Sequence, residues 1–101
     1  MKRKAYISHD EAVVRALRND PELAAEYLKA ALEEADDEPR VLLIALLHVA
    51  EARGGLAKVA KAAGIERESL YRALSQRGNP RLSTLVAVTK AMGLKITVEA
   101  A

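Results

Sequence analysis

The hydrophobic and polar positions of the chain follow a helical period from residue 8 to residue 92. Apolar residues recur three and four positions apart, which places them on one face of an α-helix. Turn signals between these stretches divide them into separate elements. We expect helices over about 8–18, from 21 into the acidic run 33–38, over 39–53 and over 82–92, with two short helices within 56–77.

Two helix starts near the N-terminus carry capping residues. Ser8 and Glu11 have the spacing of a capping box, in which the Ser hydroxyl accepts from the backbone and the carboxylate reaches back. Asp20 and Pro21 fit an N-cap and a first helical residue, because the missing N–H of proline would have no partner there. A new helix is therefore expected to start directly after the first one ends.

The stretch 56–77 predicts two short helices joined by a tight turn. Gly64 follows the first helix, where a residue without Cβ can adopt a positive φ and end the helix. The second helix carries an outward face of long polar side chains. This pattern is typical of a helix-turn-helix, and it leaves an ordinary αα-hairpin open as the alternative. The buried positions expected here are Val59, Ala60, Ala63, Ile65, Leu70, Ala73 and Leu74.

Residues 39–53 are apolar on almost every face, which is typical of a central buried helix. The neighbouring helices each carry one apolar stripe. We expect the second helix to bury Leu23, Ala24, Tyr27, Leu28, Ala31 and Leu32, and the last helix to bury Leu85, Val86, Val88, Thr89 and Met92.

The period changes near the C-terminus. Residues 94–99 alternate between apolar and polar, which predicts a β-strand. A single strand has no partner within a helical chain, so we expect it to pair with the same strand of a second copy in a symmetric homodimer. The dimerising side chains would be Leu94, Ile96 and Val98. A frayed extended tail is the alternative.

Length and composition fit one small domain. The chain has 101 residues, and its only aromatic residues are three Tyr, so the core must be aliphatic. We therefore predict a single all-α domain over residues 1–101. The lack of cysteine excludes disulfides and thiolate metal sites and favours a reducing cytoplasm. No apolar run approaches the roughly 20 residues that span a bilayer, and the basic start lacks the apolar region of a signal peptide, so no membrane is expected as a partner.

Charge divides the chain into two halves. Residues 1–50 hold seven Lys and Arg against ten Asp and Glu, a net of −3, whereas residues 51–101 hold nine against four, a net of +5. A basic half that contains the candidate helix-turn-helix is the charge distribution expected of a protein that binds double-stranded DNA. Chance clustering on a solvated surface is the alternative.

The residues give little support for catalysis. Nucleophilic and metal sites need His, Cys and carboxylate side chains that converge. His9 lies in a first helical turn, and His48 lies within an apolar helix, where a hydrogen-bonded buried residue is more common than a catalyst. We expect no enzymatic activity, no cofactor and no metal.

Part of the chain resembles a known class of DNA-binding domain. Residues 59–94, VAKAAGIERESLYRALSQRGNPRLSTLVAVTKAMGL, are similar to the Cro/cI-type (XRE-like) helix-turn-helix. From about residue 6 the whole chain resembles the HigA-like probable addiction-module antidotes. That resemblance rests on Asp20-Pro21 with AAEYLKAALEE after it, on HVAEARGG, on IERESLYRALS and on Gly78-Asn79-Pro80. It implies a five- to six-helix, lambda-repressor-like fold.

The resemblance also implies a function. Such proteins are antitoxins that bind a RelE/ParE-superfamily toxin and repress their own operon, so the implied partners are a cognate small basic toxin, double-stranded operator DNA and a second copy of the chain. On this interpretation residues 1–38 form a helical extension that faces the toxin, 39–93 the DNA-binding core, and 94–101 the dimerising strand. A stand-alone helix-turn-helix repressor and an interaction module that no longer binds DNA are the alternatives.

In a helix-turn-helix complex the N-terminal end of the second helix enters the major groove. Arg67 and Arg72 would reach guanine, and Glu68 could accept from cytosine. An ion pair between Glu68 and Arg72 is the alternative. Ser69 and Tyr71 could bond phosphate or base, or Tyr71 could cover the helix junction. The residues expected at phosphates are Lys58, Lys61, Arg77, Asn79 and Arg81.

The chain departs from the family pattern at three positions. Glu66 stands at the N-cap of the second helix, where the family usually has Ser, and glutamate caps poorly. Ala57 and Lys58 stand where a hydroxyl residue and Gln are usual, so a cap and an amide that contacts DNA are missing. Lys58 could still contact phosphate as a point charge.

Overall fold

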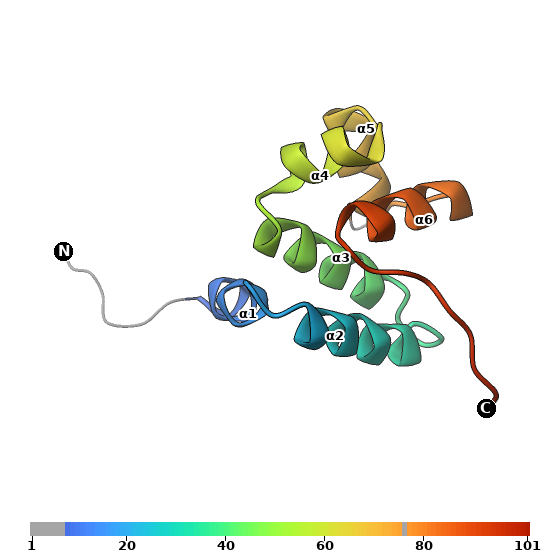
Figure 1. Cartoon of the computed structure of the whole chain (residues 1–101). Helices are drawn as coiled ribbons and strands as arrows, with labels where there is room; N and C mark the ends of the chain where they lie inside the picture. The colour runs from blue at the N-terminus through green and yellow to red at the C-terminus, as the bar shows by residue number, and fades with distance from the viewer. Residues whose placement is uncertain (1–7, 76) are drawn as a thin grey trace.

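The structure is a computed structural model that describes residues 8–75 and 77–101 (Figure 1). This part of the chain forms six helices, which are α1 (His9–Leu17), α2 (Pro21–Glu34), α3 (Arg40–Ala52), α4 (Leu56–Ala63), α5 (Arg67–Leu74) and α6 (Leu82–Ala91). Helices α1 and α2 pack against α3, which also contacts α4 and α5, and α6 packs on α4. Helix α3 therefore joins an N-terminal layer to a C-terminal one. None of the described helices is both long and apolar enough to cross a membrane.

The predicted helix starts at Ser8 and Asp20 are confirmed. The Ser8 hydroxyl accepts from the Glu11 N–H at 3.1 Å, and the Glu11 carboxylate accepts from the Ser8 N–H at 3.1 Å. The Asp20 carboxylate accepts from the Leu23 N–H at 3.0 Å, with Pro21 as the first residue of α2. Between the two helices Asn19 has a φ of 64°, a left-handed conformation that asparagine tolerates better than most residues.

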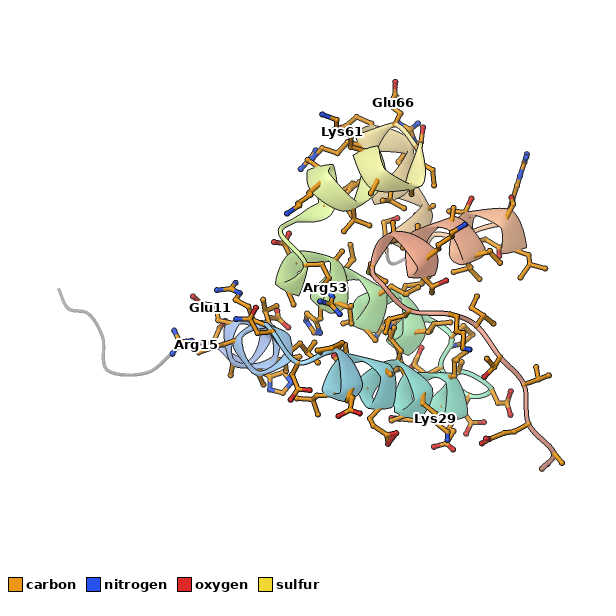
Figure 2. All side chains as sticks on the ribbon, in the orientation of Figure 1. Glu11, Arg15, Lys29, Arg53, Lys61 and Glu66 are labelled. Atoms are coloured by element: carbon orange, nitrogen blue, oxygen red, sulfur yellow. The ribbon has the colours of Figure 1, made fainter. Side chains whose placement is uncertain are left out.

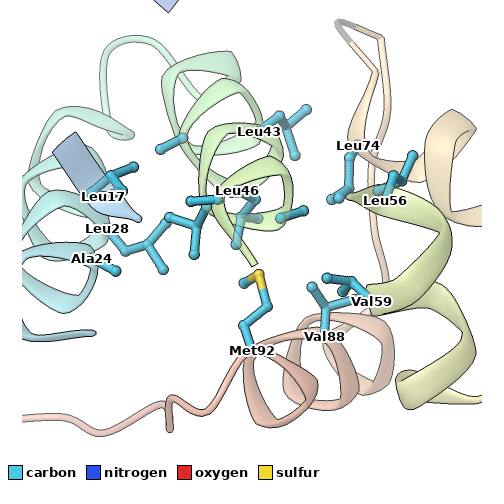
Figure 3. Packing of buried hydrophobic residues seen from close by; sticks show 14 of the residues in the cluster. Leu17, Ala24, Leu28, Leu43, Leu46, Leu56, Val59, Leu74, Val88 and Met92 are labelled. Atoms are coloured by element: carbon cyan, nitrogen blue, oxygen red, sulfur yellow. The ribbon is translucent and has the colours of Figure 1, made fainter. Parts of the chain in front are cut away.

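The core is built on the two sides of α3. Its largest fully buried side chains are Leu46, Leu70, Leu74, Met92, Val49, Val59 and Val88. Figure 3 shows Leu46 between residues of α1 and α2 on one side and residues of α4, α5 and α6 on the other. Full burial of an aliphatic side chain of this size contributes roughly 1.5–3 kcal/mol. The core is aliphatic, as the composition predicts.

Four residues that were predicted to be buried are exposed. Leu23 and Leu32 on α2 are 41% and 55% exposed. At 3.6 residues per turn they lie roughly 100° and 80° around the helix from Ala24, at the edges of the stripe that faces α3. Val86, 47% exposed, lies on the side of α6 opposite the fully buried Val88. Ile44 on α3 is 42% exposed although its helix is apolar on almost every face.

The predicted C-terminal strand is not found among the described residues. Residues 94–101 are extended, and no strand is assigned to them or to any other described residue. Alternation alone cannot make a strand, because a strand needs hydrogen bonds to a neighbour. Leu94 packs against the core, and Ile96 and Val98, the other two residues predicted to dimerise, are 48% and 96% exposed.

The tail after Leu94 instead passes α2 (Figure 1). There the Glu99 carboxylate lies 3.3 Å from the Lys29 ammonium group. The hydrogen bond and charge of Glu99, with a further contribution from Glu26, raise the pKa of Lys29 above its ordinary value of 10.5. Both side chains are largely exposed, so this contact holds the tail only weakly.

Candidate nucleic-acid interface

Helices α4 and α5 are joined by a turn of the predicted type. Gly64 has a φ of 72° and a ψ of 30°, in the left-handed region. Its N–H donates to the Lys61 carbonyl at 3.2 Å, and the Ile65 N–H donates to the Ala60 carbonyl at 2.9 Å. These two bonds form a Schellman motif, which ends α4 abruptly and lets the chain change direction before α5. The α4–α5 unit (residues 56–74) thus has the connection that its sequence predicts.

The start of α5 lacks a side-chain cap. Glu66 is the N-cap residue and its side chain makes no capping bond, as its residue type predicts. Its carboxylate instead accepts from the Ser69 hydroxyl at 3.4 Å. The backbone N–H groups of the first turn of α5 are therefore not satisfied by the side chain that precedes them, and they carry the partial positive charge of a helix N-terminus.

The cap position of α4 differs from the one predicted. Gly55 is its N-cap and makes no side-chain cap bond, whereas Ala57 lies inside the helix. The alkyl chain of Lys58 folds back over Gly54, where its Cδ would lie 2.7 Å from an added Cβ. The side chain of Lys58 is thus close to the α3–α4 connection.

The outward face of α5 carries the predicted polar side chains. Arg67, Glu68, Tyr71 and Arg72 are exposed, and Ser69 is half-buried. The predicted alternative of a pair between Glu68 and Arg72 is not found, because the Glu68 carboxylate accepts from the neighbouring Arg67 guanidinium at 3.1 Å. No carboxylate among the described residues lies within 4.0 Å of the Arg72 guanidinium.

An open depression beside α5 brings several of the predicted residues together. It is bounded by α5, by the connection from α5 to α6 and by the first turn of α6. Four of the predicted site residues line it, together with Arg81 and one residue that the sequence did not single out, Thr84 of α6. The full lining is Ser69, Arg72, Ala73, Arg77, Gly78, Asn79, Pro80, Arg81 and Thr84.

Gly78 determines the shape of this depression. A Cβ at this position would overlap the carbonyl group of Ala73 near the end of α5. The Gly78 N–H donates to the Ser75 carbonyl at 2.7 Å. Only a glycine lets the connection lie this close to α5, and this approach places Asn79 and Arg81 beside Arg72.

The remaining predicted residues lie outside the depression. Lys61, Arg67, Glu68 and Tyr71 are exposed on the α4–α5 unit, and Figure 2 shows Lys61 and Glu66 at the end of the molecule farthest from Lys29. Residues 56–91 hold seven Lys and Arg against two Glu. The surface around α5 is therefore basic over an area wider than the depression.

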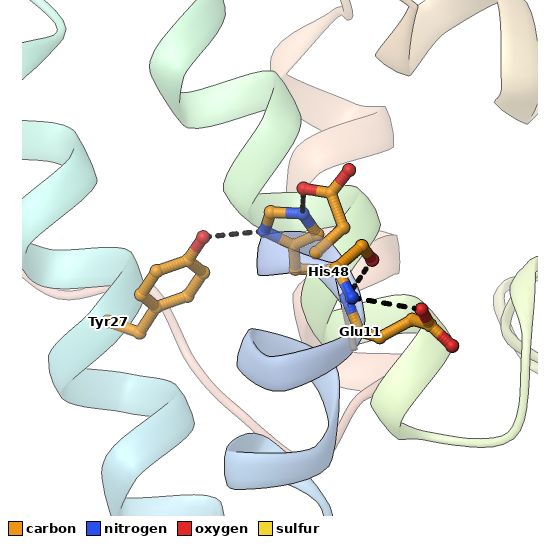
Figure 4. A network of polar contacts seen from close by, with 5 residues as sticks. Glu11, Tyr27 and His48 are labelled. Carbon is orange, nitrogen blue, oxygen red and sulfur yellow. Dashed lines mark hydrogen bonds and ion pairs between the residues drawn. The ribbon is translucent and has the colours of Figure 1, made fainter. Parts of the chain in front are cut away.

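His48 is held in a polar network on the other side of α3 (Figure 4). Its Nδ1 lies 2.6 Å from the Tyr27 hydroxyl, and its Nε2 lies 2.9 Å from the Asp10 carboxylate. An ionised carboxylate only accepts, so Nε2 donates to Asp10, and in the neutral imidazole Nδ1 then accepts from the Tyr27 hydroxyl. Burial, and next the negative charge of Asp10, raise the pKa of Tyr27 above its ordinary value of 10.0.

This network confirms the prediction that His48 is a hydrogen-bonded buried residue. It joins α1, α2 and α3, because His48 of α3 contacts Asp10, 38 positions away in α1, and Tyr27, 21 positions away in α2. Among residues 8–75 and 77–101, no three His, Asp or Glu side chains converge in a way that could hold a metal ion.

The fold and its basic surface define a small all-helical domain in which two short helices joined by a glycine turn present a cationic face. The model of one family, described as "Probable addiction module antidote protein", matches residues 8–100. The chain therefore belongs to the family of probable addiction module antidote proteins. It is also 42% identical, over 73 residues that make up 72% of each chain, to an uncharacterized protein of Haemophilus influenzae. No solved structure matches the chain at a significant level.

Proposed function

We propose that the protein is the antitoxin of a type II toxin–antitoxin module, which neutralises a small basic RelE/ParE-superfamily toxin and represses its own operon in the cytoplasm. Membership of the antidote family supports the antitoxin role and implies a toxin as a partner. Repression would take place through a helix-turn-helix formed by the α4–α5 unit.

The observation that carries the DNA-binding proposal is the basic depression beside α5. Three of its lining residues are arginines that come from α5, from the connection and from the N-cap of α6. Arginine donates two parallel hydrogen bonds to phosphate oxygens, so Arg77 and Arg81 suit the backbone of a DNA strand, with Arg72 on the side of the depression formed by α5. The neighbouring exposed face of α5 would then lie in the major groove, with Arg67 and Arg72 directed toward guanine.

Binding to an operator would use two copies of the chain. Helix α5 has only eight residues, so one copy can contact only a short half-site. Helix-turn-helix proteins commonly bind two half-sites about one helical turn apart as dimers. Sedimentation of the protein on its promoter fragment would test this, and one copy bound per operator would contradict it.

The DNA-binding proposal is tested by fluorescence anisotropy with the promoter of the protein's own operon. Replacing a base-contacting arginine costs about 1–3 kcal/mol, so Arg67→Ala and Arg72→Ala should each weaken operator binding by roughly 5- to 150-fold. Arg81→Ala should weaken binding to all sequences alike and reduce the salt slope by about 1. Arg15→Ala on α1 is the matched control and should bind as the wild type does.

Two outcomes would contradict these roles. Unchanged operator binding by both Arg67→Ala and Arg72→Ala would rule out the groove assignment. Specific DNA binding without any copurifying toxin, when the protein is coexpressed with the neighbouring gene, would instead identify the stand-alone repressor.

A further inference from the structure

A groove runs between α1 and α3 on the face that holds the His48 network. Its floor contains aliphatic side chains from both helices, and its walls are charged. The lining residues are Asp10, Glu11, Val14, Arg15 and Arg18 of α1, with Ile44, Leu47, His48 and Glu51 of α3. On α3 these residues are three and four positions apart, which is the spacing of one helix face.

Residues 8–75 and 77–101 leave part of the apolar surface of α3 uncovered at this groove. Ile44 is 42% exposed, and Leu47 and Val14 are half-buried, although α3 carries the composition of a helix that is buried all round. A groove floor that holds Val14 of α1 together with Ile44 and Leu47 of α3 offers the apolar face of another helix a place to pack, as in a helix-in-groove complex. The shape and composition of the groove therefore fit an amphipathic helix.

The charge of the helices around the groove indicates which kind of partner it can bind. Residues 9–34, which form α1 and α2, hold seven Asp and Glu against three Lys and Arg. At the groove itself Glu51 has no ion-pair partner among the described residues, and Asp10 is only partly screened by His48. The lining holds three carboxylates (Asp10, Glu11 and Glu51) against Arg15 and Arg18, so the groove keeps a net negative charge. Together with the acidic layer around it, this charge favours a partner with Lys or Arg beside its apolar face and disfavours the phosphates of DNA.

A second copy of the chain fits this charge poorly. A symmetric dimer would place one acidic α1–α2 layer against another, because both copies then use the same surface. A head-to-tail contact would place the basic α4–α5 unit of one copy in the groove of the next, which does not close and would block the surface proposed for DNA. A different, cationic protein avoids both problems.

We propose that the α1–α3 groove is the docking site for an amphipathic helix of the toxin, with cationic residues of that helix facing Glu51 and Asp10. This inference rests on the antitoxin function proposed above. It assigns the contact to one groove rather than to the whole of residues 1–38, and it includes α3 residues that lie outside that segment. The outer face of α2 is then not part of the central contact.

The test compares two matched substitutions by calorimetric titration with the protein encoded beside this gene. Ile44→Lys places a charge on the groove floor and should weaken toxin binding by about 30-fold or more, as expected for a residue at the centre of an interface. Leu32→Lys makes a similar change at a more exposed aliphatic residue of α2 that does not line the groove, and it should leave binding within about 3-fold of wild type. Glu51→Lys should weaken binding less, and the loss should shrink at high salt.

Binding to operator DNA serves as the control that a variant is still folded. Ile44→Lys should bind operator DNA as the wild type does, since Ile44 lies on the side of α3 away from Leu46 and the α4–α5 unit. If Ile44→Lys binds neither toxin nor operator DNA, the smaller change Ile44→Ser is tested in its place. Unaltered toxin binding by Ile44→Ser overturns the proposal.

The other outcomes are equally decisive. If Leu32→Lys abolishes toxin binding and Ile44→Lys preserves it, the contact lies on α2 and the proposal is overturned. If the wild type is a dimer and Ile44→Lys converts it to monomers without loss of toxin binding, a second copy fills the groove. This result also overturns the proposal. If the wild type binds no toxin, the proposed antitoxin function fails, and this inference fails with it.

Discussion

The layers on the two sides of α3 differ in charge more than in architecture. Residues 9–34, which span α1, α2 and their connection, hold seven acidic and three basic residues, whereas residues 56–91 hold two acidic and seven basic ones. Both layers are short aliphatic helices packed on the same central helix. The difference shows how one small core can support two surfaces of opposite charge, because the packing depends on the buried positions and the charge on the exposed ones.

The largest effect is expected where the two layers share a side chain. Leu46→Ala leaves a cavity in the middle of α3 and should reduce the free energy of unfolding by about 2–5 kcal/mol, as measured by urea denaturation followed by circular dichroism. Toxin binding and DNA binding should fall together, because both layers rest on Leu46. Leu32→Ala, at an exposed site, should stay within about 0.5 kcal/mol of wild type. A single lost activity in Leu46→Ala would show that the layers are energetically separate.

A smaller effect should be confined to the acidic layer. Tyr27→Phe removes the hydroxyl that donates to His48 and should destabilise the protein by about 1 kcal/mol, while operator binding is unchanged. The raised pKa of Tyr27 means that the folded protein holds this proton more tightly than the unfolded chain. The stability that depends on Tyr27 is therefore fully present below pH 10 and is lost as the pH rises through the folded-state pKa.

The control for this pH dependence is Tyr71→Phe. Tyr71 is exposed on α5 and takes no part in the His48 network, so the variant should keep the stability of the wild type. Equal pH profiles for wild type and Tyr27→Phe between pH 8 and 11 would contradict the proposed origin of the effect.

The smallest effect is expected at the ion pair between α2 and the C-terminal tail. Lys29→Ala should not change the urea midpoint measurably, because the Lys29–Glu99 pair is exposed and screened by solvent. The same result is expected for Glu99→Ala. A clear shift in either variant would show that the tail stabilises α2 more strongly than the exposed contact accounts for.

The local features of the fold were predictable from the sequence. The capping box at Ser8, the cap at Asp20 and the left-handed glycine at Gly64 all depend on residues within four positions of one another. Four residues that the sequence predicted to contact DNA lie together at one depression in the structure, namely Ser69, Arg72, Arg77 and Asn79. Their roles toward DNA remain predictions.

The features that were missed depend on how the helices pack. Helical spacing does not show how wide the covered stripe is, so Leu32 and Val86 were wrongly assigned to the interior. The alternation at 94–99 predicted a strand because a sequence pattern cannot show whether a partner is present. The network at His48 joins three helices, and Thr84 reaches the depression only because Gly78 lies against α5. No local signal specifies either arrangement.

The central position of α3 has a consequence for hydrogen exchange. Val49 and Ala50 have no exposed surface, and their helix contacts four of the other five. Their amide protons should exchange only when the whole domain unfolds, whereas amides of α1 and α5 can exchange through local opening. Deuterium uptake at the centre of α3 therefore reports the global stability, and any slower uptake in α1 or α5 on adding a partner identifies the layer that the partner covers.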